Sequence, residues 1–245
     1  LAAELTAPDA SPTANGRVRT VSGYATAKEA WMHGAPDAVA LARRLVDAYP
    51  PMAHAGCRVH NGLTTGENAV YVARPAASSA ARAVEPEFWM PTVVPRDVST
   101  GDLRSSGCYL LNVWTDDGKL VELAEHPGLW GYIEQHRAAL KDRGIARRNA
   151  DAWYRTIDRV KPGLLKTPKL LVADIAVTPR FALDPGTVYP RNGVYCLTSG
   201  AWPLPALRLV LESGLAHLIV AATSARVRGG YLRCQAQYLR RIPLV

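Results

Sequence analysis

Apolar residues recur at helical spacing in three separate stretches of the chain. The stretches are 36–49, 126–144 and 203–222, and one further helical turn is expected over 235–241. Pro36 stands where the first helix should begin, and Pro50-Pro51 stands where it should end. The third stretch is expected to break at Ser213-Gly214. The pattern therefore predicts three helices, each with an apolar face to bury.

Short runs of apolar and β-branched residues between these helices predict strands. The runs are 69–72, 108–114, 119–123, 169–177, 187–191 and 194–198. Asp116-Asp117-Gly118 and Asn192-Gly193 are typical of hairpin turns, so each is expected to join the strands beside it. Pro190 has no backbone N–H to donate, so its strand is expected at a sheet edge. The mixture predicts an α+β fold of antiparallel hairpins and short sheets with helices packed outside.

The chain divides into a tail and a folded part. Residues 1–35 are expected to form an N-terminal tail or linker, because 7–16 are rich in proline, alanine and small polar residues. Residues 36–245 are expected to fold as one domain or as two lobes, about 36–150 and 151–245. The first residue is Leu1 rather than methionine, which favours a piece cut from a longer protein.

Positive charge is concentrated in two segments of a chain whose formal net charge is +8. Residues 137–169 hold ten Lys or Arg and three Asp, and residues 226–241 hold five Arg and no acidic residue. Segregated basic charge is typical of proteins that bind phosphate groups, so nucleic acid is the expected partner. The alternative is a basic surface without a partner.

Cysteine usage and hydropathy indicate the compartment. Cys57, Cys108, Cys196 and Cys234 lie far apart, without the spacing of a zinc site or a disulfide framework. The longest uncharged apolar stretch, around 215–222, is too short to span a membrane, and no segment resembles a signal peptide. The sequence therefore predicts a cytoplasmic protein with reduced thiols, no metal site and no membrane attachment.

No catalytic constellation is visible in the sequence. The chain has no Gly-x-Gly nucleotide loop, P-loop, His-x-x-x-His pair or Gly-x-Ser-x-Gly elbow. His217 is interpreted as a core residue, and His54 and His60 as residues of a surface loop. Asp116-Asp117 is interpreted as turn chemistry. We therefore expect no catalytic residue in this chain alone.

Polar loops and basic side chains favour binding instead. Thr64, Thr65, Gly66 and Asn68 lie in the loop 61–68, whose hydroxyl, amide and backbone N–H groups suit phosphate or base-edge contacts; a plain turn is the alternative. Arg96 is expected to pair with Asp97 or to reach a partner. Trp153, Tyr154 and Arg155 fit either a base-stacking surface or packing beneath a helix.

The last basic segment combines arginines with two adjacent glycines. Arg226, Arg228 and Arg233 flank Gly229-Gly230, and Gln235 follows. Arginine forms bidentate pairs with guanine, worth roughly 1–3 kcal/mol of discrimination. Where arginine contacts phosphate instead, each contact contributes about −0.9 to the log–log salt slope of binding. This C-terminal basic segment is therefore expected to bind a polyanion, through base edges or through phosphates.

Six motifs stand in order over about residues 50–243. They are Gly62-Leu63-Thr64-Thr65-Gly66-Glu67-Asn68, Met90-Pro91 through Arg96-Asp97, His126-Pro127 through Arg143 with Trp153-Tyr154 after it, Thr167-Pro168-Lys169, Asn192-Gly193, and Arg228-Gly229-Gly230. In this order they resemble the C-terminal target-recognition (specificity) domain of adenine-specific DNA methyltransferases of restriction-modification systems, type IIG-like. The resemblance implies double-stranded DNA as partner and DNA-binding roles for Thr64, Thr65, Gly66, Asn68, Arg96, Lys169, Arg226, Arg228, Gly229, Gly230, Arg233 and Gln235.

The chain also departs from such enzymes. The resemblance implies an upstream catalytic domain with an S-adenosylmethionine loop and an Asn-Pro-Pro-Tyr motif, and neither occurs here, since Tyr49-Pro50-Pro51-Met52 is a different sequence. The cofactor and the catalytic domain are therefore expected outside this chain, whose own expected role is to select the duplex site and clamp it for flipping of the target base. The alternative function is a protein-interaction module of a phage-defence complex that retains the recognition fold. An RNA-binding protein is disfavoured because RRM and KH signatures are absent.

Overall fold

The structure is a computed structural model that describes residues 32 and 34–244. The expected tail or linker over 1–35 lies almost entirely outside the described residues. From Pro36 onward the chain forms mixed helices and short sheets, so the α+β prediction is confirmed.

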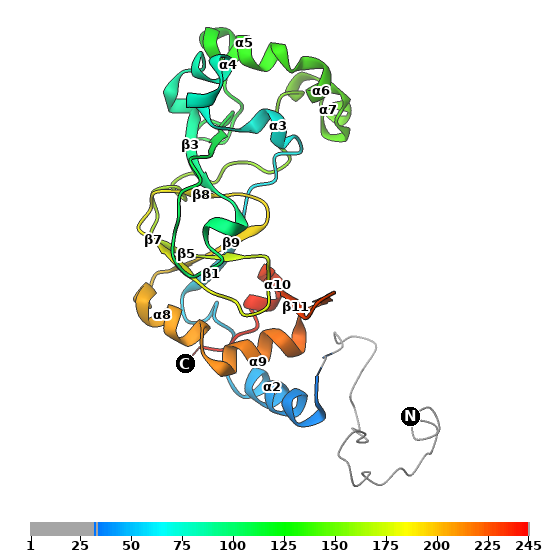
Figure 1. The fold of residues 1–245 in the computed structure, drawn as a ribbon, viewed down its shortest axis with the longest axis vertical. Helices are drawn as coiled ribbons and strands as arrows, with labels where there is room; N and C mark the ends of the chain where they lie inside the picture. Colours follow the sequence, from blue (N-terminus) through cyan, green and yellow to red (C-terminus); the bar gives the residue numbers. More distant parts are fainter. Residues whose placement is uncertain (1–31, 33, 245) are drawn as a thin grey trace, which may run out of the picture.

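A four-stranded antiparallel sheet lies at the centre of the molecule (Figure 1). Its order is β1-β9-β5-β7, with β1 at Cys57–Asn61, β9 at Val194–Ser199, β5 at Lys169–Ala173 and β7 at Ala182–Asp184. Every residue of β5 is buried. Because successive side chains of a strand point to opposite faces, a fully buried strand indicates that both faces of this sheet are covered.

Helices cover one face of the central sheet. They are α2 at Pro36–Ala48, α8 at Leu204–Leu211, α9 at Gly214–Thr223 and α10 at Ala236–Leu239. Their apolar residues form one hydrophobic core, the α9 core, with Leu170, Val172 and Leu197 of the sheet. The helix that begins at Pro36 and the break between α8 and α9 are confirmed as predicted.

A second sheet and further helices cover the opposite face. The sheet order is β2-β4-β3-β8, with β2 at Val72–Ala73, β4 at Tyr109–Leu111, β3 at Trp89–Val93 and β8 at Tyr189–Pro190. The helices are α3 at Asn68–Tyr71, α4 at Ser79–Arg82, α5 at Pro127–Gln135, α6 at Arg137–Asp142 and α7 at Gly144–Arg148. Leu171, Ala173 and Cys196 join them in the second core, the α5 core.

The remaining elements are short. A third sheet consists of β10 at Arg226–Val227, β11 at Tyr231–Arg233 and β6 at Ile175–Ala176. Single 3-10 turns cover Pro75–Ala77 (η1), Pro86–Phe88 (η2), Pro95–Asp97 (η3), Leu123–Glu125 (η4) and Ala150–Ala152 (η5). Pro190 lies in β8 at the edge of its sheet, which confirms its predicted place.

The two cores do not divide the chain near residue 150. The α9 core contains Ala42, Met52 and Val59 together with residues from Leu170 onward. The intervening chain, from Leu63 to Leu165, supplies most of the α5 core. Figure 1 shows the consequence: α3–α7 lie at one end of the long axis, α2, α8 and α9 at the other, and the central sheet between them.

The predicted strand over 69–72 is a helix instead. The side chain of Glu67 accepts a hydrogen bond from the backbone N–H of Ala69 and caps the first turn of α3. One helical turn buries Val70 and Tyr71 together in the α5 core, and the Tyr71 hydroxyl donates to the backbone O of Tyr154. Tertiary packing here outweighs the strand propensity of valine and tyrosine.

The Asn192-Gly193 turn forms, but it does not join a hairpin. The backbone N–H of Val194 donates to Arg191 O at 2.9 Å, and Gly193 adopts φ of +90° as the turn requires. The flanking strands nevertheless enter different sheets, because β8 pairs in parallel with β3 while β9 pairs with β1 and β5. The expected pairing of 187–191 with 194–198 is therefore wrong.

Three other predicted elements are interrupted. The hairpin around Asp116-Asp117-Gly118 is reduced to a turn and one bridge between Trp114 and Leu120. The strand over 169–177 splits at Asp174 into β5 and β6, whose partners lie in different sheets. The helix over 126–144 breaks at His136 into α5 and α6. The first and third of these segments nevertheless pack on both sides of the break into the same α5 core.

Candidate nucleic-acid interface

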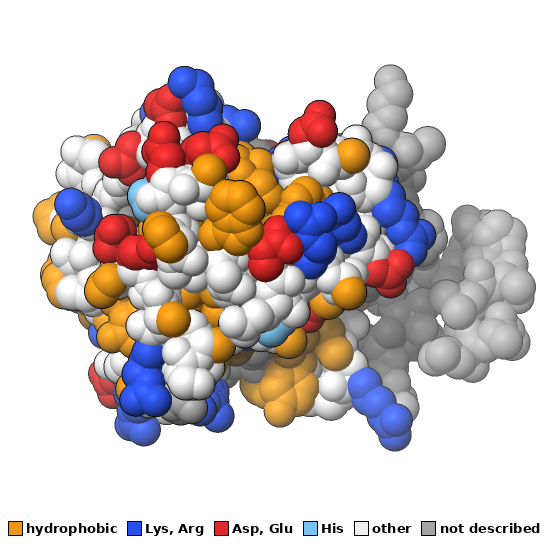
Figure 2. Space-filling view, turned by 90° about the horizontal axis from the view of Figure 1, so that it is seen from above, with side chains coloured by type: hydrophobic (Ala, Val, Ile, Leu, Met, Phe, Trp, Pro, Cys, Tyr) orange, Lys and Arg blue, Asp and Glu red, His pale blue; other side chains and the backbone are white. Residues whose placement is uncertain are grey.

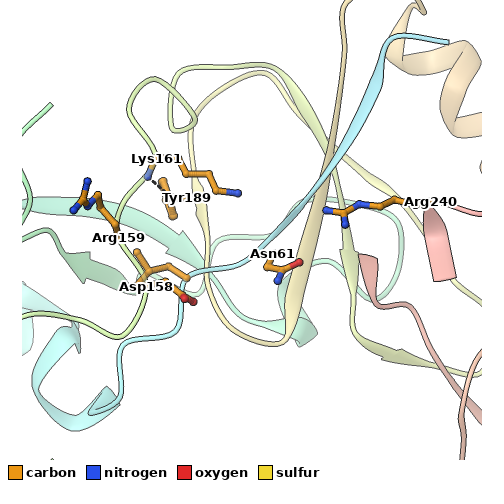
Figure 3. Close-up of a pocket in the computed structure, with 7 residues that line it drawn as sticks. Asn61, Asp158, Arg159, Lys161, Tyr189 and Arg240 are labelled. Atoms are coloured by element: carbon orange, nitrogen blue, oxygen red, sulfur yellow. Dashed lines mark hydrogen bonds between the residues drawn. The ribbon is translucent and has the colours of Figure 1, made fainter. Parts of the chain in front are cut away.

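Two adjoining hollows, of about 280 and 210 Å³, lie beside β1 and share Lys161. Figure 3 shows the larger of the two. We call them together the β1 groove. Its lining residues are Arg58, His60, Asn61, Leu63, Asp158, Arg159, Lys161, Pro162, Leu164, Thr167, Tyr189, Thr198 and Arg240. They come from β1 and the residue Leu63 after it, from the loop 158–167, from β8 and β9, and from the end of α10, so the groove is assembled from segments far apart in the sequence.

The groove follows the outer side of an edge strand. β1 pairs with β9 on one side only, so the backbone of its other side is open to other partners. Arg240 reaches this open side, where its Nη2 donates to the backbone O of Val59 at 2.8 Å. The arginine thereby covers the strand edge with a cation, which also discourages pairing with another chain.

Positive charge dominates the groove. Its lining contains four cations against one carboxylate, that of Asp158. The cations are Arg58, Arg159, Lys161 and Arg240, and none forms an ion pair with any residue that the structure describes. Cations gathered in a hollow with a low-dielectric wall create a strong local potential, which attracts anions.

The pKa of His60 reflects this positive potential. A charged lysine has only donors, so the 3.3 Å contact of Lys161 Nζ with His60 Nδ1 assigns Nδ1 as acceptor and leaves Nε2–H to donate to Thr198 Oγ1 at 3.0 Å. Partial burial, and then the charges of Lys161, Arg58 and Arg240, lower the pKa of the imidazole. His60 is therefore neutral at pH 7, with three cations around it.

The loop Thr64–Asn68 lies next to the groove. Thr64 donates its backbone N–H to Asp158 Oδ2 at 2.8 Å and accepts from the backbone N–H of Asp158 at 3.0 Å. Arg143 Nη1 donates to Thr65 O at 3.2 Å. These bonds fix the loop against 155–158 and hold Asp158, the one carboxylate of the groove, in place.

The side chains of that loop differ in accessibility. Thr65 is buried, and its hydroxyl donates to Asn68 Oδ1 at 2.9 Å and accepts from the backbone N–H of Glu67 at 3.2 Å. Thr65 therefore shapes the loop, whereas Gly66 and Asn68 are exposed and Thr64 is half-buried. Gly66 adopts φ of +80°, a conformation in which other residues are strained.

Lys169 cannot contact DNA as the resemblance implies, because its side chain is fully buried. Its Nζ lies 2.6 Å from Asp184 Oδ2 and donates to the backbone oxygens of Leu164, Leu165 and Thr167 at 3.0–3.1 Å. A buried ammonium requires such a full set of partners. The lysine anchors the loop 164–167 to the central sheet, and this corrects its assignment.

Arg96 remains available to a partner. It lies in η3, directly after β3, and 70% of its side chain is exposed. Its ion pair with Asp97 is long, at 3.8 Å. Asp97 is instead engaged by the backbone N–H of Val94 at 2.9 Å and by the hydroxyl of Ser106 at 2.8 Å.

The basic ending forms a β-hairpin rather than a plain loop. β10 and β11 pair antiparallel around Arg228, Gly229 and Gly230, and both glycines have positive φ, +87° and +82°. Arg226 and Arg228 are exposed and have no ion-pair partner among residues 34–244. Figure 1 shows this hairpin projecting beside α10 and α9.

Two other expected contact residues lie at the base of the hairpin. Arg233 Nη1 donates to Asp174 Oδ2 at 2.6 Å, so its charge is already paired. Gln235 is half-buried just before α10. Of the three arginines around the hairpin, Arg226 and Arg228 are therefore the two without an ion-pair partner among the described residues.

The sequence reading missed the side chains that form the groove. His60 was expected in a surface loop and lies in β1 instead, and Asn61 was expected to begin the polar loop 61–68 but is the last residue of β1. Arg58, Arg159, Lys161 and Arg240 were not singled out. The two basic segments did contain the signal, since Arg159 and Lys161 belong to 137–169 and Arg240 to 226–241. Only the fold brings these segments to the same strand.

The opposite end of the molecule has a different charge distribution. Figure 2 looks onto the end that carries α4–α7 and shows acidic, basic and apolar side chains intermixed. Arg137 pairs there with Glu134, and Arg147 with Asp142. The basic segment 137–169 therefore does not form one patch, and of its cations only Arg159 and Lys161 line the β1 groove.

Other chemistry is not supported by the described residues. Within them, no cluster of three His, Cys, Asp or Glu is placed to hold a metal ion. Burial raises the pKa of both the Cys196 and the Cys234 thiol to about 12, so neither is a reactive thiolate.

Among the same residues, only α8 and α9 taken together have the length and apolar composition of a membrane-spanning helix. No single helix is long and apolar enough to cross a membrane, and the pair α8 and α9, which passes by length and composition, is bent by 60°.

No protein-family model matches the chain, but curated proteins do. It is 40% identical over 222 residues to the type II methyltransferase M.XhoI of Xanthomonas vasicola, which covers 91% of the chain and 40% of that protein. It is 38% identical over 242 residues to the type II methyltransferase M.PaeR7I of Pseudomonas aeruginosa, covering 99% and 41%. It is 34% identical over 219 residues to the type II methyltransferase M.BstVI of Geobacillus stearothermophilus, covering 88% and 38%.

The homologues of this chain are therefore type II methyltransferases, and the chain spans about two fifths of their length. Among solved structures, the type IIL restriction-modification enzyme MmeI, in complex with DNA, matches with a TM-score of 0.53 at 15% identity. The match covers 73% of this chain and 23% of MmeI. At that identity the likeness concerns the fold.

Proposed function

We propose that this chain is the target-recognition part of a type II DNA methyltransferase that modifies adenine at N6. In this role it binds double-stranded DNA and selects the site for a catalytic region that lies outside the chain. The observation that carries the proposal is the β1 groove, where Arg58, Arg159, Lys161 and Arg240 gather without an ion-pair partner among the described residues; the Arg159 guanidinium lies over the Trp114 ring. The homology to about two fifths of three type II methyltransferases supports it.

The groove cations suit the phosphate backbone. Their side chains are exposed, and they flank one strand edge from two sides, so they can hold a phosphate backbone that passes along β1. Such contacts fix the register of a protein on DNA without selecting a sequence. They also contribute binding free energy that offsets part of the few kcal/mol required to extrude a base.

The β10–β11 hairpin and the Thr64–Asn68 loop supply further contacts in this proposal. The hairpin projects with Arg226 and Arg228 exposed, and a two-stranded β-ribbon fits into the major groove of B-DNA. The loop presents Gly66 and Asn68 beside the groove. Arg96 is exposed on η3 and is assigned a phosphate.

S-adenosylmethionine is assigned to the catalytic region outside this chain. The residues that line the β1 groove and the hollow between α2, α8 and α9 do not fit this cofactor, because neither lining includes a glycine-rich turn between a parallel strand and a helix.

A second candidate function is a protein-interaction module of a phage-defence complex. The observation that favours it is a hollow of about 180 Å³ between α2, α8 and α9. Its lining is almost wholly apolar: Leu45, Tyr49, Val210, Ser213, Leu215, Ala216, Ile219, Ile242 and Pro243. Exposed apolar surface of this kind is common at protein contacts.

Salt dependence of DNA binding separates the two candidates. Fluorescence anisotropy of a labelled 30-base-pair duplex is measured from 50 to 300 mM NaCl, with single-stranded DNA and RNA of the same sequence as competitors. A log–log slope of several units with preference for the duplex is expected, because each phosphate contact contributes about −0.9. Absence of duplex binding would contradict the proposal and favour the interaction module.

A matched control tests where the duplex lies. Arg137→Gln removes the same charge as Lys161→Gln, but Arg137 is paired with Glu134 at the far end of the molecule. The slope is expected to fall with Lys161→Gln and to stay unchanged with Arg137→Gln. Equal effects of the two substitutions would show that net charge alone drives the binding.

A further inference from the structure

We propose that Asn61 is a specificity-determining residue whose carboxamide reads the edge of an adenine between the phosphate contacts of the β1 groove. The inference rests on the proposed function, since it requires a duplex in that groove. It is carried by the placement of Asn61, by its unused hydrogen-bonding groups and by the cations on both sides of it.

The backbone at Asn61 is held rigidly. Asn61 is the last residue of β1 and is paired with Tyr195 of β9. The next residue, Gly62, is so close to the backbone oxygens of Arg191 and Val194 that no Cβ would fit. Leu63 then bonds to Pro190 O at 3.0 Å. A side chain mounted on such a fixed backbone reaches the same point in every molecule, which base reading requires.

The carboxamide of Asn61 is free to bind a ligand. Its side chain is exposed and makes no hydrogen bond within the part of the chain that the structure describes. Its polar neighbours are occupied: Asp158 by the backbone N–H of Thr64, and Tyr189 Oη by the backbone N–H of Lys161 at 2.9 Å. Asn61 is thus the one carboxamide in this hollow, and neither its donor nor its acceptor is used within the described residues.

Cations flank Asn61 on opposite sides. Figure 3 shows Lys161 and Arg159 to one side of it and Arg240 to the other. Cations bind phosphates of any sequence, whereas a carboxamide presents a donor and an acceptor together and pairs bidentately with adenine N6 and N7. Cations in these positions suit backbone contacts, and the amide between them suits a base edge.

Substitutions at Asn61 and Lys161 distinguish recognition of a base edge from binding of the phosphate backbone. Asn61→Ala removes both hydrogen-bonding groups. Asn61→Asp keeps the shape of the side chain but leaves acceptors only, which suits the N4 amino group of cytosine. Lys161→Gln removes one neighbouring cation and leaves the amide in place. Both positions are exposed, so circular dichroism and thermal unfolding should show wild-type folding for all three variants.

The experiment selects duplexes from a pool with a randomised central segment, using the full chain and each variant. The wild type should select a site that contains at least one strongly preferred adenine. Asn61→Ala should lose the preference at that position by roughly 5- to 150-fold. Asn61→Asp should shift it toward cytosine. Lys161→Gln should keep the selected site and reduce the log–log salt slope by about 0.9.

The outcomes distinguish the two proposals. If Asn61→Ala binds duplex and selects the same site as the wild type, the reading role is overturned while the proposed function stands. A wild type that binds duplex but selects no sequence has the same consequence. If the wild type binds no duplex, the proposed function fails and the role of Asn61 fails with it.

Discussion

Lys161 and Lys169 belong to the same basic segment, eight residues apart, yet the fold gives them opposite environments. Lys169 is fully buried, with Asp184 at 2.6 Å and three backbone oxygens as acceptors. Lys161 is exposed, lines the β1 groove and has no ion-pair partner among the described residues. One lysine holds the fold together, and the other is available to a phosphate.

The difference shows that a charge counted in the sequence is not a charge presented to a ligand. Of the two basic segments, Arg137 and Arg147 are paired with acids of neighbouring helices, and Arg233 is paired with Asp174. Among the residues without an ion-pair partner in the described part of the chain, Arg159, Lys161 and Arg240 line the β1 groove, and Arg226 and Arg228 lie on the β10–β11 hairpin. Substitution of Lys169 should therefore change the stability of the protein, whereas substitution of Lys161 should change its affinity for DNA.

The largest effect is expected from Lys169→Met. The substitution leaves the Asp184 carboxylate buried without its cation, which should lower the free energy of unfolding by about 3–5 kcal/mol. Urea denaturation followed by circular dichroism measures it. If Lys169→Met were as stable as the wild type but no longer bound DNA, Lys169 would contact DNA directly, contrary to its burial in the structure.

The next effect is expected from the double substitution Arg226→Gln and Arg228→Gln. Loss of two phosphate contacts should reduce the log–log salt slope by about 1.8, which is roughly 60-fold in affinity at 0.1 M salt. Anisotropy titrations of a duplex measure this, and thermal unfolding should be unchanged because both side chains are exposed. Unchanged duplex binding would remove the hairpin from the interface.

A smaller effect is expected from Lys161→Gln. One lost phosphate contact should reduce the salt slope by about 0.9 and the affinity roughly eightfold at 0.1 M salt. The free energy of unfolding should stay within about 0.5 kcal/mol of the wild type, as is usual for exposed residues. A large destabilisation with no change of slope would make Lys161 a structural residue like Lys169.

The smallest effect is expected from pH. The pKa of His60 is lowered in the free protein by burial and by Lys161, Arg58 and Arg240. A bound phosphate adds negative charge beside these cations and so raises that pKa. The protonated protein should therefore bind duplex more tightly, and affinity should rise as pH falls from about 7.5 through the ordinary histidine pKa of about 6.5.

His60→Gln is the control for this pH dependence. Glutamine keeps an acceptor and a donor but does not titrate in this range, so the rise in affinity should flatten. Anisotropy titrations at several pH values measure it, and NMR of the imidazole reports the pKa with and without duplex. An imidazole pKa that does not change on addition of duplex would place the DNA away from His60.

Local patterns predicted the helices better than the strands. α2 and the pair α8 and α9 follow from helical periodicity and from Pro36, Pro50 and Ser213-Gly214. The strands at 187–198 were assigned to each other, because a turn signal says only that the chain reverses. Which strand pairs with which depends on residues such as Trp89 and Leu170, far away in the sequence.

The candidate site was predicted in part, for the same reason. The basic segments, the exposed Arg226 and Arg228 and the polar loop at Thr64 were visible as runs of residue type. Asn61 was included only as one member of that loop, because nothing in the pattern distinguishes it from the other polar residues there. Its position gains meaning only from Arg240 and Lys161, which are brought beside it by α10 and by the loop 158–167.

The sequence by itself determined the α+β class, the edge position of Pro190, the main helices and the presence of excess positive charge. These depend on local geometry and on composition, which a linear pattern records. The tertiary structure alone decided that Lys169 is buried, that 68–71 form a helix and that four cations meet along β1. Burial and charge pairing depend on distances across the fold, and residues adjacent in space are seldom adjacent in the chain.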